Sequence, residues 1–179
     1  MSRIPYPDPE TLSAEKREIL SGAAGRVLNV SHMAMHAPDA LWLAQRRLGR
    51  ATVYESTLDE KLRELLILRV AYLCGSDYEL FHHLSIAENV GVTADQRDAM
   101  RTGDFSCLSK QERALADFVT EVVRDVSPSD ATLRAAREVF SLTHIFEMVI
   151  MIGGYMTTAR MAAVGGVEPD EIAVTGWQR

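Results

Sequence analysis

The amino-acid sequence predicts an all-α protein, a bundle of about eight helices, and three observations support this fold class. Leu, Ala and Met are abundant, while aromatic residues make up only 7% of the 179 residues, a composition that favours helices over strands. No segment alternates apolar and polar residues over more than a few positions, as a half-buried strand would. Ser, Thr or Asp precedes most apolar segments, as helix-capping residues do.

The capping residues and the apolar periodicity divide the chain into eight predicted helices. Their starting points, in order, are Ser13, Asp39, Thr57, Ser76, Thr93, Ser109, Ser129 and Leu142. The first, third, fourth, sixth and eighth of these helices are predicted to end at Ala24, Cys74, Gly91, Val126 and Ala163, respectively. In the second helix, the positions predicted to face inward are Leu41, Ala44, Leu48 and Val53.

The domain organisation is predicted to be simple. With 47% apolar and 25% charged residues, residues 1–179 can form a single globular domain with a sizeable core. The prolines Pro5, Pro7 and Pro9 indicate that residues 1–12 form an extended N-terminal arm.

Two predicted helices are apolar nearly all round, those over Leu58–Cys74 and Leu142–Ala163. A helix without a polar face is typically buried on every side. Two such helices in so small a chain indicate that contacts between subunits cover part of the surface. We therefore expect a homo-oligomer, a dimer, trimer or hexamer.

Several classes of function are not expected. The net charge is −6 and Lys and Arg form no runs, so nucleic-acid binding is not predicted. No membrane association is expected, because the longest apolar stretches are about ten residues. No metal is expected, since H-E-x-x-H and dense His/Asp/Glu clusters are missing, and Cys74 and Cys107 have neither disulfide nor zinc spacing. With no signal-peptide core near Met1, the predicted location is the cytoplasm.

The predicted helix after Gly75 carries a carboxylate and an imidazole on its apolar face. His83 lies in the middle of that face, and Glu79 precedes it by one turn. Such a pair can hold a proton near neutral pH and act as a general acid or base. Two structural alternatives remain: Ser76 and Glu79 form an S-x-x-E capping box, and a single His on an apolar face is often a core residue. His82 is predicted to lie at the surface or in an interface.

A second carboxylate, Glu64, shares a face with Ile67, Leu68 and Ala71 in the preceding helix. A partly buried Glu tends to have a raised pKa, which suits proton transfer. If this face meets His83, the site contains two carboxylates and one imidazole. Alternatively, Glu64 pairs with Arg63 of another subunit or with Arg69.

The segments Leu58–Ala71 and Gly75–His83 resemble the carboxymuconolactone decarboxylase and AhpD-like family. A longer subgroup of that family is resembled by Ile4–Tyr6 in the arm, by Ser129–Thr132 and by Gly166–Pro169 near the C-terminus. The resemblance implies an AhpD-like helical bundle. The Glu, Cys, Cys and His positions of the family's peroxidases fall here on Glu64, Ser76, Glu79 and His83. With both cysteines replaced, disulfide-based peroxidase activity is not expected. Asp77–Leu84 instead resembles the D-x-E-L-x-x-H-L pattern of the decarboxylase-like branch.

The hypothesis drawn from the residues and the resemblance is a cofactor-independent lyase or isomerase that acts on a small organic acid or lactone, in the catabolism of aromatic compounds. His83 transfers the proton, Glu79 orients His83, and Glu64 is a second acid or base. Further residues assigned to substrate binding are Ser76, Tyr72 and Arg69. The alternatives are a non-catalytic oligomeric protein with the family fold and a thiol peroxidase.

Overall fold

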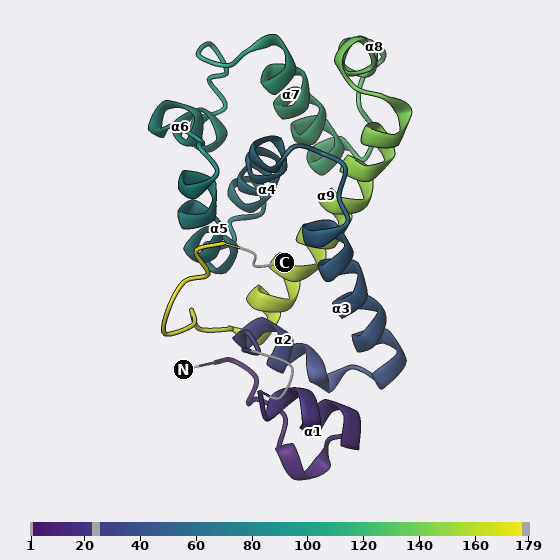
Figure 1. The fold of residues 1–179 in the computed structure, drawn as a ribbon, viewed down its shortest axis with the longest axis vertical. Coiled ribbons are helices and arrows are strands. Elements are labelled where there is room, and N and C mark those ends of the chain that lie inside the picture. Colours follow the sequence, from purple (N-terminus) through teal and green to yellow (C-terminus); the bar gives the residue numbers. More distant parts are fainter. Residues whose placement is uncertain (1, 23–25, 177–179) are drawn as a thin grey trace.

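The structure, a computed structural model, describes residues 2–22 and 26–176, and these form helices connected by loops, with no strand (Figure 1). The all-α prediction is therefore confirmed. The helices are α1 Ala14–Leu20, α2 Asn29–Met33, α3 Asp39–Tyr54, α4 Glu60–Cys74, α5 Asp77–Asn89, α6 Ala94–Thr102, α7 Lys110–Asp125, α8 Asp130–Val139 and α9 Leu142–Gly165, with short 3₁₀ turns at Pro9–Thr11 and Ala34–His36.

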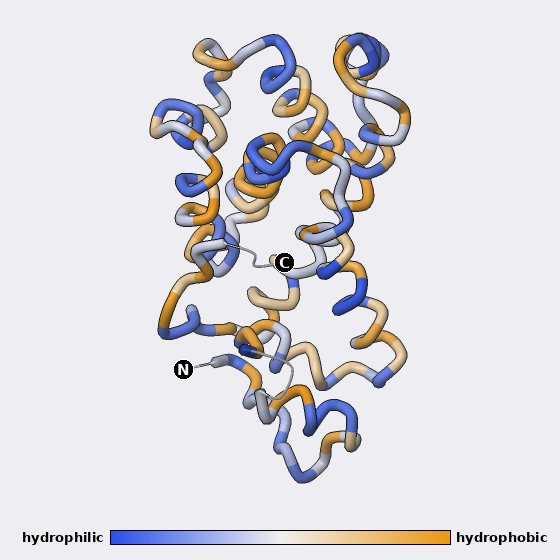
Figure 2. Tube along the Cα trace, viewed as in Figure 1, coloured by the Kyte–Doolittle hydropathy of each residue, from blue (hydrophilic) through white to orange (hydrophobic). Residues whose placement is uncertain are grey.

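Helix α4 is the centre of the fold. Every residue from Leu62 to Ala71 is buried, and the helix packs against α5, α6, α7 and α9. Asp59 caps its start by accepting hydrogen bonds from two backbone N–H groups, and Gly75 ends it in the left-handed conformation, with φ of 62°. Figure 2 shows the apolar residues of α4 and of the helices around it. The predicted burial on every side is thus confirmed for this helix, within a single chain.

Helix α9 extends from beside α8 to beside α2 and joins the helices at these two ends (Figure 1). It contacts α2, α3, α4, α5, α7 and α8, but it is not buried on every side. An apolar stripe remains exposed and consists of Leu142, Phe146, Val149, Ile150 and Val164. Among the described residues, α9 is also the one helix long and apolar enough to cross a membrane, which is weak evidence in a helix whose other side packs on the core.

The N-terminal third differs from the prediction in its details. Helix α1 ends at Leu20, and the predicted end at Ala24 lies outside the described residues. The short helix α2 was not predicted, and the arm contains a 3₁₀ turn. Near its start, the arm donates backbone hydrogen bonds from Arg3 and Ile4 to the carbonyl of Gly165. The beginning of the chain therefore lies beside the end of α9.

The inward face of α3 was predicted wrongly in part. Leu41 is 65% exposed, whereas Trp42 and Thr52 are buried. Trp42 is held there by a hydrogen bond from Nε1 to the carbonyl of Ser31. Helix α3 packs against α9 and the 3₁₀ turn at Ala34–His36, so these partners, and not the strongest apolar periodicity, select its buried face.

This difference gives a matched pair of leucines for measuring stability. Leu65 of α4 is fully buried, and its replacement by Ala is expected to lower the free energy of unfolding by about 2–5 kcal/mol through lost burial and a cavity. Leu41→Ala is expected to change it by no more than about 0.5 kcal/mol. Urea unfolding followed by circular dichroism measures both, and similar losses for the two variants would contradict the central position of α4.

Candidate active site

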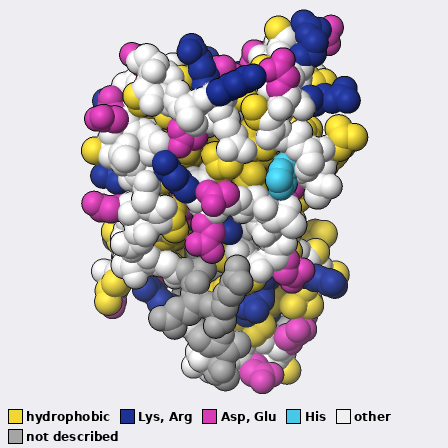
Figure 3. Space-filling view, turned by 45° about the horizontal axis from the view of Figure 1, so that its top comes forward, with side chains coloured by type: hydrophobic (Ala, Val, Ile, Leu, Met, Phe, Trp, Pro, Cys, Tyr) yellow, Lys and Arg dark blue, Asp and Glu magenta, His cyan; other side chains and the backbone are white. Residues whose placement is uncertain are grey.

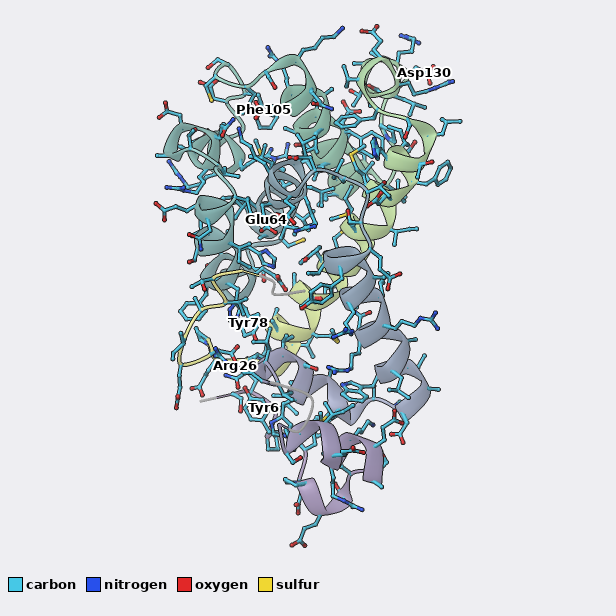
Figure 4. All side chains as sticks on the ribbon, viewed as in Figure 1. Tyr6, Arg26, Glu64, Tyr78, Phe105 and Asp130 are labelled. Atoms are coloured by element: carbon cyan, nitrogen blue, oxygen red, sulfur yellow. The ribbon has the colours of Figure 1, made fainter. Side chains whose placement is uncertain are left out.

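A cavity of about 420 Å³ lies between α3, α5 and α9. Its wall consists of α3 residues between Gln45 and Tyr54, of α5 residues between Tyr78 and His83, of α9 residues between Gly154 and Thr158, and of the loop and α2 residues between Arg26 and Ser31. Four segments far apart in the sequence thus enclose one space. In Figure 4, Tyr78 and Arg26 mark its lower part and Glu64 lies above them.

The start of α5 places Glu79 in this wall. Ser76 caps the helix by accepting a hydrogen bond from the Glu79 backbone N–H, at 3.4 Å. The predicted capping role of Ser76 is therefore confirmed. The second half of a capping box is not formed, because the Ser76 N–H donates to the carbonyl of Ala71. The Glu79 carboxylate instead lies beside His83, with Oε2 3.4 Å from Nε2.

The other ring nitrogen of His83 is held by α4. Nδ1 of His83 lies 2.7 Å from Oε2 of Glu64, whose side chain has no exposed surface. Because a carboxylate only accepts hydrogen bonds, this contact places a proton on Nδ1. The conditional prediction that the Glu64 face meets His83 is confirmed. Arg63 of the same chain is a weaker neighbour of Glu64, with Nε 3.8 Å from Oε1.

Burial and the two carboxylates set the protonation of this group. Burial opposes the charged imidazolium, but the charge and hydrogen bond of Glu64, together with the charge of Glu79, raise the pKa of His83 above its ordinary value. Burial also raises the pKa of Glu79, and the Glu64 charge adds to this, while His83 acts in the opposite direction. Glu79 and His83 therefore compete for one proton close to the cavity.

Tyr155 of α9 completes this end of the cavity. Its ring packs edge-on against the imidazole of His83, with centroids 5.2 Å apart and planes at 86°. Burial and the charges of Glu64 and Glu79 raise the pKa of Tyr155 well above its ordinary value, and Thr52 lies within hydrogen-bond reach of its phenol. Tyr155 thus remains a neutral O–H donor beside the imidazole.

The prediction that His82 lies at the surface or in an interface is corrected by the structure. His82 is buried, with Nε2 3.0 Å from Oδ2 of Asp170 and with Nδ1 accepting a hydrogen bond from the Val174 N–H. The Tyr78 hydroxyl donates to the same oxygen of Asp170, at 2.5 Å. Burial lowers the pKa of His82, although Asp170 opposes this. The C-terminal segment, folded back over α5, is what covers His82.

The three residues assigned to substrate binding are not among the described residues that line the cavity. Ser76 is buried at the helix cap. Arg69 donates to the Thr120 hydroxyl and to the carbonyl of Met100. Tyr72 packs on the side of the main core. The structure brings together Glu64, Glu79 and His83, but not these three.

Sequence reasoning missed the contributions of α3 and α9. Thr52, Arg46, Arg50 and Tyr155 all line the cavity, yet they lie far from the Glu79–His83 motif in the sequence. The available signal was the polar composition of the α3 surface, where Arg46, Arg47 and Arg50 interrupt the apolar pattern.

The cysteines lie elsewhere. Cys74, at the end of α4, is half-buried and packs against the main core, and burial raises the pKa of its thiol. Cys107 is exposed between α6 and α7. Neither lines the cavity in the described part of the chain, where there is also no group of three or more His, Cys, Asp and Glu side chains arranged to hold a metal ion.

Comparison with known proteins agrees with this architecture. Residues 38–121, which include Glu64, Glu79 and His83, match the model of the carboxymuconolactone decarboxylase family. A search of curated proteins found no match. The resemblance noted in the sequence is therefore confirmed for this region.

Three solved structures share the fold. A protein of unknown function from Agrobacterium tumefaciens, described as a putative antioxidant defence protein AhpD, is 22% identical, with 76% of this chain and 94% of that chain covered and a TM-score of 0.69. An uncharacterized peroxidase-related protein from Ralstonia eutropha, with an alkylhydroperoxidase AhpD core, is 21% identical over 95% and 93%, with a TM-score of 0.77. An uncharacterized peroxidase-related protein from Silicibacter is 20% identical over 94% and 91%, with a TM-score of 0.75. At these identities, the likeness shows an AhpD-like fold.

The electrostatic coupling at the site predicts how a charge-removing substitution acts. Glu64→Gln is expected to lower the pKa of His83, because Glu64 supplies the largest interaction that favours the imidazolium. Glu79→Gln, the matched control, is expected to lower it less. NMR titration of the His83 ring protons measures both pKa values, and an unchanged His83 pKa in Glu64→Gln would contradict the assignment.

The same shift affects stability in a defined pH range. Because folding raises the pKa of His83 above 6.5, this residue stabilises the fold fully below about pH 6.5, and the contribution is lost as the pH rises through the folded-state pKa. In Glu64→Gln, the His83 contribution to the difference in unfolding free energy between pH 5.5 and pH 8 should decrease. An undiminished difference, measured by urea unfolding at the two pH values, would contradict the coupling.

Proposed function

We propose, starting from the match of residues 38–121 to the carboxymuconolactone decarboxylase family, that this protein is a cofactor-independent acid–base enzyme of the lyase or decarboxylase type. Its substrate is a small organic acid or lactone. One observation carries the proposal: Glu79 and His83 meet in the wall of a cavity of about 420 Å³, while Glu64 holds the imidazole from behind.

The geometry supports a different division of roles from the one expected from the sequence. Glu64 does not line the cavity, and its short contact with Nδ1 makes it the residue that orients His83 and fixes its tautomer. Glu79 lines the cavity and faces Nε2. In this proposal Glu79 and the Nε2 side of His83 exchange the proton with the substrate, and Glu64 is a positioning residue.

The proposed reaction is a decarboxylation in which the site donates one proton to the product and recovers one from water. The bond between the carboxylate carbon and the neighbouring carbon breaks, carbon dioxide leaves, and the electron pair forms an enolate. Protonated Glu79 or the imidazolium of His83 then gives its proton to the carbon, and water restores the proton to the site. The neutral phenol of Tyr155 is placed to donate to the enolate oxygen, as a preorganised donor in a site of low dielectric.

The raised pKa of Glu79 supports this use of the site. A carboxyl group that is buried next to a second carboxylate stays protonated to a higher pH and can serve as an acid near neutrality. On the side of the imidazole away from the cavity, the negative charge of buried Glu64 is offset by the positive charge of buried Arg63. The proton shared by Glu79 and His83 is therefore the one that is exchangeable with a ligand.

The other two hypotheses receive less support. A non-catalytic protein would have Glu64 and His83 bonded to one another with no cavity beside them, but a cavity adjoins His83. The solved structures described as peroxidase-related favour a peroxidase, but Ser76 and Glu79 occupy the positions of the paired cysteines. A buried thiol with a raised pKa, as in Cys74, is a poor nucleophile.

Subunit association remains part of the proposal. The exposed apolar stripe of α9 is a surface of the kind that a second copy of the chain covers in a homo-oligomer. The expectation of a homo-oligomer rested on two helices that are apolar nearly all round. The segment Leu62–Ala71 of α4 is buried within one chain, so of the two only α9 still presents an apolar surface to a second subunit.

The proposed reaction predicts the effect of removing the proton carrier. In a screen of lactones and β-keto acids for carbon dioxide release, His83→Gln is expected to lower kcat by ~10²–10⁴, the usual contribution of a positioned acid or base. Glu79→Gln is expected to lower it by a comparable factor and to change the pH profile. Ser106→Ala, at an exposed position outside the cavity, serves as the control. An unchanged kcat in His83→Gln would remove this residue from the mechanism.

The peroxidase hypothesis has its own test. If thiols are not involved, any consumption of peroxide with a dithiol reductant should persist when Cys74 and Cys107 are both replaced by Ser. The rate of peroxide loss, followed by absorbance, gives the result. Loss of that activity in the double variant, with the fold intact by circular dichroism, would favour thiol chemistry over the proposed reaction.

A further inference from the structure

Two arginines of α3 line the cavity without forming an ion pair with any carboxylate of residues 2–22 and 26–176. Arg46 and Arg50 are one helical turn apart, and both lie in the cavity wall. Their guanidinium groups lie over the rings of Trp42 and Tyr54, at 6.0 Å and 5.1 Å from the centroids. A third arginine of the wall, Arg26, is already engaged, with Nη2 3.5 Å from Oδ1 of Asp170.

The charge of the cavity is therefore positive at the α3 side. Among the described lining residues, Glu79 is the only carboxylate, and burial raises its pKa. On the face drawn in Figure 3, basic side chains lie among acidic ones. Two unpaired arginines on the wall of a cavity are thus a local excess of positive charge, which attracts an anion.

The arginines and the reacting groups lie at different places along the cavity. Thr52 is next to Tyr155, which packs on His83. Along the axis of α3, Arg46 precedes Thr52 by six residues, roughly 9 Å, and Arg50 precedes it by two residues, roughly 3 Å. Leu48, an apolar residue of the wall, lies between Arg46 and Thr52 in the sequence.

A glycine widens the space between these two ends. Gly49 lies between Arg46 and Thr52 in α3, and it lines the cavity. A Cβ atom built on Gly49 would have no heavy atom within 4 Å. The space beside Gly49, between Arg46 and Thr52, is therefore open.

We propose that Arg46 and Arg50 form an anion subsite that holds an acid group of the substrate away from the reacting atoms. The ligand class is an amphipathic organic acid, in which an apolar spacer separates the acid group from a carbonyl or lactone next to His83 and Glu79. The inference rests on the proposed function only for the reacting end. This acid group is distinct from the carboxylate that the proposed reaction removes at the Glu79–His83 end of the cavity.

The test measures binding and needs no turnover. Isothermal titration calorimetry at low salt compares 6-oxoheptanoate, octanoate and 4-phenylbutyrate with their primary amides, which have no charge. The wild-type protein should bind the acids more tightly than the amides. Arg46→Gln/Arg50→Gln should weaken binding of the acids by about 10- to 100-fold, as expected for loss of charged hydrogen bonds, and leave the amides unchanged. Equal binding of acids and amides, or no binding of any of these compounds, would overturn the subsite.

Matched variants separate charge from folding. Arg47 lies on the same helix but outside the cavity wall and is exposed, so Arg47→Gln should bind the acids as the wild type does. Arg46→Lys/Arg50→Lys should bind the acids more tightly than the double Gln variant does, because lysine retains the charge, but less tightly than the wild type, because it loses the planar group that stacks on Trp42 and Tyr54. A loss of affinity in Arg47→Gln equal to that in the double Gln variant would overturn the assignment to Arg46 and Arg50.

His83→Gln distinguishes failure of the subsite from failure of the proposed reaction. In this variant octanoate, which has no carbonyl to meet residue 83, should bind as it does to the wild type, because the subsite acts independently of proton transfer. If the wild type turns over none of the screened compounds but binds the acids through the arginines, the reaction is wrong and the subsite holds. If a compound is turned over and acids bind no more tightly than amides, the subsite is wrong and the reaction holds.

Gly49→Leu tests the path between the two ends. The added side chain meets no atom near its Cβ and leucine favours a helix more than glycine does, so the variant should fold with an unchanged or higher Tm. It should weaken binding of 4-phenylbutyrate at least tenfold by filling the space. Unchanged binding in a folded Gly49→Leu variant would show that the acids bind elsewhere.

Discussion

The contact between Glu64 of α4 and His83 of α5 is the constraint on which the site depends. A charged carboxylate without exposed surface is costly unless a partner compensates it. Here Nδ1 of His83 supplies that partner at 2.7 Å, and the imidazole is thereby turned so that its other nitrogen faces Glu79. One buried hydrogen bond between adjacent helices therefore fixes the orientation and the protonation of the candidate catalytic group.

The polar side chains of α4 around this contact have partners on neighbouring helices, while Nε of Arg63 and Oε1 of Glu64 face one another at 3.8 Å without a hydrogen bond. Helix α4 carries Arg63, Glu64 and Arg69 in an otherwise apolar, fully buried segment. Each finds a partner: Arg63 donates to the carbonyl of Val53, and Arg69 to Thr120 and Met100. The polar side chains of α4 thus attach it to α3, α5, α6 and α7, while only Glu64 among them faces the imidazole.

Local patterns predicted much of this, and long-range packing decided the rest. The helices, the Ser76 cap and the Glu79–His83 pair follow from spacing along one helix, and Glu64 follows from its position on an apolar face. Which carboxylate lies closer to His83 depends on how α4 packs on α5, so the roles that we propose for Glu64 and Glu79 differ from those expected from the sequence. The burial of His82 depends on Asp170, and the position of Tyr155 depends on α9, both far away in the sequence.

In the arrangement that we propose, Glu64 holds a proton on Nδ1 of His83 and leaves Nε2 to exchange protons on the cavity side. A long-range ¹H–¹⁵N correlation spectrum, recorded as the pH is raised through the His83 pKa, tests it most directly. The structure predicts that Nε2 loses its proton while Nδ1 keeps it, whereas His82, which donates from Nε2 to Asp170 and accepts at Nδ1, shows the opposite tautomer. A neutral His83 protonated on Nε2 would contradict the account.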